Sequence, residues 1–167
     1  IMSKYILNID EVLRDSISSI MISKGLTVSV AESCTGGFIS TFFTSGSGAS
    51  AFFKGSMIVY GNESKIKLLD INPVLIDKHG VVSQAIVEKM ADSVKKKYNT
   101  NYGLATTGYI ELNSSQSIDS NHSLHAWISI ASHNNIISKS LIFHKSRIEN
   151  ISDVSHILLN LFRKEIL

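Results

Sequence analysis

The spacing of apolar residues at the start of the chain, first helix-like and then strand-like, limits the fold more than any other feature. Residues 8–24 carry apolar side chains three and four positions apart, the stripe of an amphipathic helix, and Gly25 follows as a predicted C-terminal cap. Residues 26–31 then alternate in the manner of a strand, and a cluster of small residues separates them from a second predicted helix at 35–44. A helix, a strand and a helix in close succession favour an α/β domain.

The rest of the chain predicts further elements of both kinds. Strands are predicted at 53–60, 102–107, 124–131 and 136–143, and helices at 63–69, 83–98 and 148–164. Pro73 is expected to break the chain before the 83–98 helix. Residues 132–135 are expected to turn the last two strands into an antiparallel hairpin, whereas residues 108–123 have no period and predict a long surface loop. This order favours a three-layer α/β/α sandwich around a mixed sheet, with residues 1–167 forming one domain.

Composition and charge exclude several classes of protein. Hydrophobic residues make up 44% of the chain and charged residues 18%, which is typical of globular domains and not of disordered chains. A net charge of +2 gives no basic surface for nucleic acid, and the lysines at 95–97 are expected at a helix C-terminus, where the dipole favours cations. The chain shows no signal peptide or membrane-spanning stretch, and its single cysteine, Cys34, excludes an internal disulfide. We therefore expect a cytoplasmic protein that binds neither nucleic acid nor membrane.

The turn after the first predicted strand is the strongest candidate for a functional site. It places Ser33 where a strand ends and a helix begins, and such a turn exposes side chains and free backbone N–H groups together. If Ser33 attacked an amide carbon, the N–H groups of Thr35, Gly36 and Gly37 would be suited to hold the developing oxyanion. The same residue types also occur in ordinary helix caps and turns, so the turn alone leaves both interpretations open.

A series of segments resembles one known family. Residues 31–37 read AESCTGG, and residues 59–65 read VYGNESK. Segments 48–53, 79–83 and 105–108, together with Arg147, continue the similarity in order. The chain thus resembles the CinA C-terminal domain family, which includes PncC-type nicotinamide mononucleotide deamidases, over nearly its whole length. The resemblance implies a CinA-like α/β/α fold and a cofactor-independent amidohydrolase that acts on a small-molecule amide, a nicotinamide nucleotide, as a homo-oligomer.

The resemblance also implies roles for particular side chains. Its catalytic set corresponds to Ser33, Tyr60 and Lys65, in which a lysine with a lowered pKa would take the serine proton with the help of the tyrosine. On the residues alone, the simpler interpretations are favoured, with Tyr60 as an amphipathic residue at a strand end and Lys65 as an exposed lysine on a short helix. Oxyanion or substrate contacts are expected from Thr35, Gly36, Gly37, Ser50, Thr107, Gly108 and Arg147. Arg147 would hold a substrate phosphate, in one arrangement across a subunit boundary, and Glu32 and Asn62 would support the site.

One segment departs from the family pattern. After Thr107 and Gly108 the family continues to an Ala-Gly-Pro sequence, whereas residues 109–111 of this chain are Tyr-Ile-Glu. A carboxylate at Glu111 would lie near a substrate phosphate and lower its affinity. Two explanations stay open: a pocket remodelled for a related amide, or an inactive CinA-like domain that binds a ligand or a partner. The intact catalytic set favours retained hydrolysis.

Two other chemistries are less well supported. His122 and His125 would point to opposite faces of a strand and have no companion ligands, so no bound metal is expected. A dehydrogenase of the short-chain kind would also use Ser, Tyr and Lys, but Tyr60 and Lys65 do not have its spacing and the chain lacks an N-terminal glycine-rich dinucleotide loop.

Overall fold

The computed structural model describes residues 8–111 and 124–167, which form a five-stranded sheet of order β2-β1-β3-β4-β5 with helices between the strands. Strands are β1 (Val28–Glu32), β2 (Phe53–Ile58), β3 (Tyr102–Tyr109), β4 (His125–Ala131) and β5 (Ile136–Ile142). Helices are α1 (Glu11–Lys24), α2 (Phe38–Thr44), α3 (Asn62–Leu69), α4 (Pro73–His79), α5 (Gln84–Tyr98) and α6 (Arg147–Ile166), with a 3-10 turn η1 (Ala49–Ala51). Strands β2, β1 and β3 are parallel, β4 pairs antiparallel with β3, and β5 pairs antiparallel with β4.

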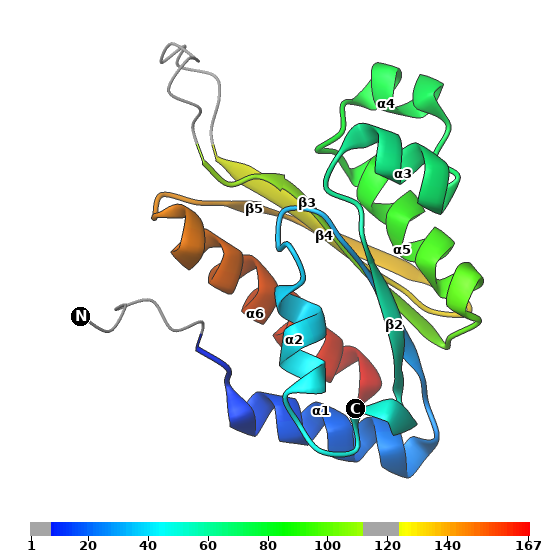
Figure 1. Ribbon diagram of the computed structural model, residues 1–167, viewed down its shortest axis with the longest axis vertical. Helices are drawn as coiled ribbons and strands as arrows, with labels where there is room; N and C mark the ends of the chain where they lie inside the picture. Colours follow the sequence, from blue (N-terminus) through cyan, green and yellow to red (C-terminus); the bar gives the residue numbers. More distant parts are fainter. Residues whose placement is uncertain (1–7, 112–123) are drawn as a thin grey trace.

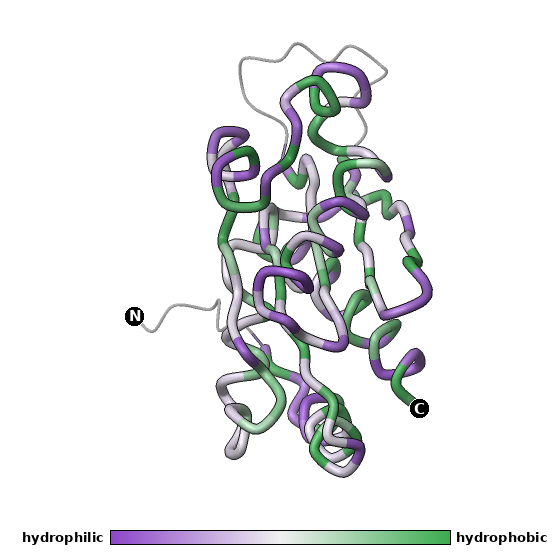
Figure 2. Tube along the Cα trace, turned by 90° about the vertical axis from the view of Figure 1, so that its right-hand side faces the viewer, coloured by the Kyte–Doolittle hydropathy of each residue, from purple (hydrophilic) through white to green (hydrophobic). Residues whose placement is uncertain are grey.

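Helices cover both faces of the sheet. Helices α1, α2 and α6 lie on one face and α3, α4 and α5 on the other (Figure 1). Each side has its own cluster of buried apolar side chains, and strands of the sheet contribute to both. The tube in Figure 2 changes between green and purple around the helical turns, as expected of helices with one buried face. The predicted three-layer α/β/α sandwich with a mixed sheet is confirmed.

The helix ends explain where the chain turns. The side chain of Asp10 accepts a hydrogen bond from the Leu13 amide at 2.9 Å and caps α1, and Gly25 ends the helix with a φ of 63°. Helix α3 ends before Pro73 and α5 follows later, but the sequence analysis did not predict helix α4, which this proline begins. Asn72 caps α4 by accepting from the Val74 amide, and a proline at the first helical position loses no hydrogen bond.

The predicted loop at 108–123 is also corrected at its start. Gly108 and Tyr109 continue β3 and pair with Ala126 and His125. Residues 112–123, including His122, lie outside the described residues. No helix within residues 8–111 and 124–167 has both the length and the apolar character needed to cross a membrane.

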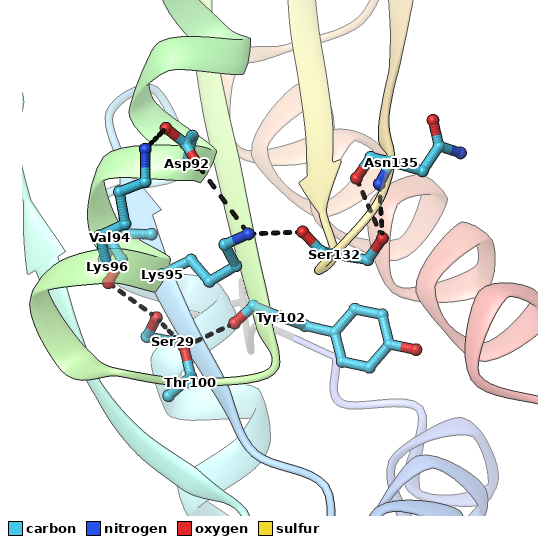
Figure 3. A network of polar contacts seen from close by, with 9 residues as sticks. All are labelled: Ser29, Asp92, Val94, Lys95, Lys96, Thr100, Tyr102, Ser132 and Asn135. Carbon is cyan, nitrogen blue, oxygen red and sulfur yellow. Dashed lines mark hydrogen bonds and ion pairs between the residues drawn. The ribbon is translucent and has the colours of Figure 1, made fainter.

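At the amino ends of β1 and β3, polar contacts connect the sheet to α5 and to the turns around it (Figure 3). The Ser29 hydroxyl donates to the Val94 carbonyl at 3.1 Å and lies 2.8 Å from the Thr100 hydroxyl. Lys95, in the last turn of α5 as predicted, donates to the Ser132 carbonyl in the turn between β4 and β5. These bonds fix the connections of α5 and of the hairpin at this end of the sheet.

The opposite end of the sheet collects the carboxyl ends of three parallel strands. Glu32, the last residue of β1, pairs with Ile58 of β2 on one side and with Thr106 of β3 on the other. All five residues of β1 are buried. In open α/β sheets this edge is where ligands bind, because the loops that follow the strands converge there.

Candidate active site

The turn between β1 and α2 is shaped by two glycines. Gly36 and Gly37 have φ angles of 59° and 102°, a region that side chains with a Cβ rarely occupy. The Gly36 amide donates to the Ser33 carbonyl at 3.2 Å, which closes the turn. Ser33 is thereby held at the carboxyl edge of the sheet, as predicted, and only 6% of its surface is exposed.

The carboxylate of Glu32 holds this turn from inside the protein. Glu32 is fully buried, and its Oε2 accepts from the Thr35 hydroxyl at 2.7 Å and from the amides of Gly37 and Ile39. Its Oε1 accepts from both the amide and the hydroxyl of Ser40, at 2.8 and 2.6 Å. A buried carboxylate is stable only with such donors, and here they come from the turn and the first residues of α2. Glu32 thus orients the turn that carries Ser33.

Ser33 meets Lys65 in the interior. Lys65 lies on α3 with 1% of its surface exposed, and its Nζ is 3.0 Å from Ser33 Oγ. The same nitrogen donates to the carbonyls of Val59 at 2.7 Å and Tyr60 at 3.1 Å. As an ammonium, Lys65 donates to all three oxygens. As a neutral amine, it keeps both carbonyls as acceptors and turns its lone pair toward the Ser33 O–H, which is the geometry of a general base.

Burial of Lys65 favours the neutral form of the amine, which a general base requires. Desolvation lowers the pKa of Lys65 from 10.5 to about 8. At pH 7 about a tenth of the side chains are then neutral, against well under one in a thousand for an exposed lysine. The pair can therefore activate a serine near neutral pH without a histidine.

Cys34, next to Ser33, has the opposite character. Desolvation raises the pKa of its thiol to about 12, and 4% of the residue's surface is exposed. A thiol that stays protonated is a poor nucleophile. Of the two neighbouring candidates, Ser33 is the one with a base in contact.

The candidate oxyanion donors differ in availability. The Gly36 amide is bound to the Ser33 carbonyl and the Gly37 amide to Glu32. The Thr35 amide, by contrast, donates to no residue within the described part of the chain. Thr35 therefore supplies the turn amide that is available to a developing oxyanion.

Thr106 is a site residue that the sequence analysis did not select. Its carbonyl accepts from the Ser33 amide at 3.2 Å, and its hydroxyl lies 3.3 Å from that amide and 2.9 Å from the Thr35 hydroxyl. A usable signal was its position at the end of a buried strand that could pair with the strand before Ser33. Without the register of β1 and β3, that signal did not distinguish Thr106 from Thr107.

The backbone and the side chain of Tyr60 have different surroundings. Its carbonyl binds the Lys65 amine, but 60% of the residue's surface is exposed and its hydroxyl accepts from the Arg147 guanidinium. Arg147 also donates to the Glu111 carboxylate at 3.0 Å. The structure thus brings Tyr60, Arg147 and Glu111 together at the protein surface, whereas Ser33 and Lys65 meet beneath it. We call this group of three surface residues the rim of the site.

The other predicted site residues are not all near Ser33. Thr107 is buried and donates its hydroxyl to the Val81 carbonyl at 3.0 Å. A Cβ on Gly108 would lie 2.6 Å from the Cβ of Ala126, so close packing of β3 on β4 requires this glycine. Asn62 begins α3 and lines a surface hollow there. Ser50 lies in η1, before β2, at the edge of the sheet opposite Ser33, so a single chain does not bring it to the site.

No three or more His, Cys, Asp or Glu side chains gather into a metal-binding group among residues 8–111 and 124–167. The site is instead defined by a buried Ser–Lys pair at the carboxyl edge of a mixed α/β/α sheet, the class of domain in which loops after parallel strands supply the polar groups.

The chain belongs to the CinA C-terminal domain family, whose model matches residues 10–166. A CinA-like protein of Flavobacterium psychrophilum is 38% identical over 159 residues, which cover 95% of this chain and 37% of that protein. A CinA-like protein of Dictyoglomus turgidum is 45% identical over 96 residues, or 58% of this chain and 23% of that protein. The chain therefore matches well under half of the length of these curated relatives.

Solved structures share the fold at lower identity. The competence or damage-inducible protein from Enterobacter asburiae superposes with a TM-score of 0.88 at 20% identity, covering 96% of this chain and 99% of that one. The competence/damage inducible protein CihA from Agrobacterium tumefaciens gives a TM-score of 0.83 at 24% identity, covering 91% and 92%. At these identities the likeness concerns the fold.

Proposed function

We propose that this domain is an amidohydrolase in which Ser33 attacks the carbon of a carboxamide. The observation that carries the proposal is the buried contact of 3.0 Å between Lys65 Nζ and Ser33 Oγ. A serine hydroxyl is a weak nucleophile until a base accepts its proton, and a lysine with a pKa of about 8 is such a base. One amine can serve as the base in both half-reactions, so the proposed reaction needs no cofactor.

The reaction has two halves. In the first, neutral Lys65 takes the Ser33 proton as Oγ bonds to the amide carbon, and the Thr35 amide stabilises the oxyanion. Collapse of this intermediate breaks the carbon–nitrogen bond, and the Lys65 ammonium returns the proton so that ammonia leaves. In the second, Lys65 takes a proton from water as the water attacks the carbon of the Ser33 ester. Collapse of this intermediate breaks the bond between that carbon and Ser33 Oγ, and the Lys65 ammonium returns its proton to Oγ, so that the carboxylic acid leaves and Ser33 is restored.

Tyr60 is proposed to act through both of its ends. Its carbonyl accepts from the Lys65 amine and would orient it toward Ser33, and its hydroxyl, which accepts from Arg147, would contact a bound substrate. Nicotinamide mononucleotide is the substrate that the family resemblance suggests, because it carries a carboxamide on an aromatic ring. Homo-oligomer formation is also part of the proposal.

The test is ammonia release from nicotinamide mononucleotide by the purified protein. Ser33→Ala is expected to lower kcat by at least about 10³-fold, and Lys65→Met by about 10²- to 10⁴-fold. Lys67→Met is the matched lysine control, because Lys67 lies on the same helix with 75% of its side chain exposed. Ser19→Ala, on the exposed side of α1, is the serine control.

Equal ammonia release by the parent and Ser33→Ala would end the role of Ser33. If the parent releases no ammonia from a panel of carboxamides but gains thermal stability on adding one of them, the second candidate holds, a CinA-like domain that binds without hydrolysis. The Glu111–Arg147 ion pair is the observation behind this second candidate, because it would weaken the binding of a phosphorylated substrate.

A further inference from the structure

We infer that Glu111 determines the substrate class of this site by acting as an internal counter-ion for Arg147, so that carboxamides without a phosphate are preferred over their phosphorylated analogues. The inference rests on the proposed function, because it assumes that the carboxamide reacts at Ser33. Glu111 is expected to change binding, which is measured separately from hydrolysis.

The two charged residues are held in place from inside the protein. Glu111 follows β3, and Arg147 is the first residue of α6. The fully buried Asn150 donates its amide to the Ile110 carbonyl at 3.0 Å and to the Lys145 carbonyl at 2.9 Å. These two carbonyls belong to the residue before Glu111 and to the loop just before Arg147. The ion pair therefore joins two backbone segments whose relative position is fixed, unlike a contact between two mobile surface side chains.

Arg147 is linked to the reacting groups through one residue. Its guanidinium donates from one nitrogen to the Tyr60 hydroxyl and from the other to the Glu111 carboxylate. The Tyr60 carbonyl in turn accepts from Lys65 Nζ, which contacts Ser33. A substrate whose carboxamide reaches Ser33 would extend past Tyr60 toward this guanidinium.

Helix stability does not account for the position of Arg147. Cations in the first turn of a helix face the positive end of the dipole, and α6 has its own capping box from Ser146 and Glu149. A guanidinium is suited to bind an anionic group through two parallel hydrogen bonds. In this chain one of its nitrogens is already bound to a carboxylate of the protein. Glu111 therefore occupies the position that a substrate anion would need.

An incoming phosphate must displace Glu111 or lie beside it. The pair is partly exposed, with 37% of the Arg147 side chain and 54% of the Glu111 side chain accessible, so screening moderates the effect. Loss of the ion pair and repulsion between the two anions together are expected to weaken phosphate binding by about tenfold. A neutral group at the same position avoids both penalties.

The test compares nicotinamide mononucleotide with nicotinamide riboside, which differ by the phosphate alone. Dissociation constants are measured by calorimetry at low ionic strength for the parent protein, for Glu111→Gln and for Glu11→Gln. The last is a matched control, because Glu11 is an exposed acid beside Arg14 on α1. Glu111→Gln is expected to tighten the mononucleotide about tenfold without tightening the riboside, and Glu11→Gln to change neither. Added salt is expected to reduce the tightening.

Tighter binding of the mononucleotide than of the riboside by the parent, equal tightening of both ligands by Glu111→Gln, no change in either, or no binding of either ligand by any of the proteins would overturn the inference. Ammonia release, measured on the same samples, separates it from the proposed function. Selective tightening without ammonia release would support Glu111 as the specificity residue and reject hydrolysis, whereas ammonia release with unchanged selectivity would do the reverse.

Discussion

At the scale of single residues, contact with a buried amine distinguishes Ser33 from the other serines in residues 8–111 and 124–167. Lys65 is as buried as the core side chains around it, and its Nζ has three oxygen partners. The two carbonyls compensate for the loss of water around the amine, and desolvation still lowers its pKa to about 8. Its environment thus makes Lys65 both a hydrogen-bond donor that holds the turn and a base of useful strength.

The first prediction concerns the pH dependence of amide hydrolysis. The base must be neutral, and Lys65 loses its proton as the pH rises through about 8. We therefore expect kcat/KM to increase about tenfold per pH unit between pH 6 and 7.5 and to level off above about pH 8.5. Initial rates in buffers of constant ionic strength measure the profile. A rate independent of pH across this range would contradict Lys65 as the base, and the Lys67→Met control should retain the parent profile.

The sequence indicated residues of the site, but it did not indicate whether their side chains or their backbone groups make the contacts. The contact between Ser33 and Lys65 is present, although only the family resemblance brought these two residues together before the structure was known. Tyr60 was selected for its hydroxyl, whereas the contact with Lys65 is made by its carbonyl. A motif names residues but does not state whether a side chain or the main chain makes the contact. Thr106 was not selected for a related reason, since strand register decides which threonine faces the turn.

At the scale of elements, local signals predicted most helices and strands within a few residues. Asp10, Gly25 and Ser83 are at the caps where their residue types are favoured. The exceptions are places where a local signal has two meanings. Pro73 was interpreted as a break, but proline is equally at home at the first position of a helix, and Asn72 beside it completes a cap. Residues 108–123 show no period, so nothing in the sequence indicated that β3 continues past Thr107. Pairing with β4 extends β3 to Tyr109.

The packing of α5 on β3 gives a prediction at this scale. Gly103 lies on β3 directly beneath α5, and a Cβ there would lie 2.1 Å from the Ala91 carbonyl oxygen. Because backbone cannot move aside as a side chain does, Gly103→Ala is expected to lower the free energy of unfolding by about 2–4 kcal/mol. Urea unfolding followed by circular dichroism measures the change. Gly61→Ala is the control, because its Cβ would come no closer than 3.9 Å to Ser64 Oγ, and a loss there as large as that at Gly103 would contradict the steric argument.

At the scale of the whole molecule, one sheet separates two apolar clusters. The order of helices and strands along the chain predicted the layers, but it did not predict the strand order β2-β1-β3-β4-β5. Parallel neighbours such as β1 and β3 are joined only through distant parts of the chain, so their pairing leaves no local pattern. That pairing places Thr106 beside the turn of Ser33, which is why the site is a property of the complete sheet.

The shared sheet predicts that the two layers unfold together. Phe162 is fully buried on α6 in one layer, whereas Trp127, the single tryptophan, packs against the cluster on the opposite face. Phe162→Ala is expected to lower the free energy of unfolding by about 3–5 kcal/mol, from the cavity that it leaves. Because both clusters include strands of one sheet, Trp127 fluorescence and far-ultraviolet circular dichroism should shift by the same amount in urea. Val12→Ala, at a position 83% exposed on α1, should change stability by no more than about 0.5 kcal/mol. A fluorescence midpoint that stays at the parent value in Phe162→Ala, while circular dichroism shifts, would show that the layers unfold independently.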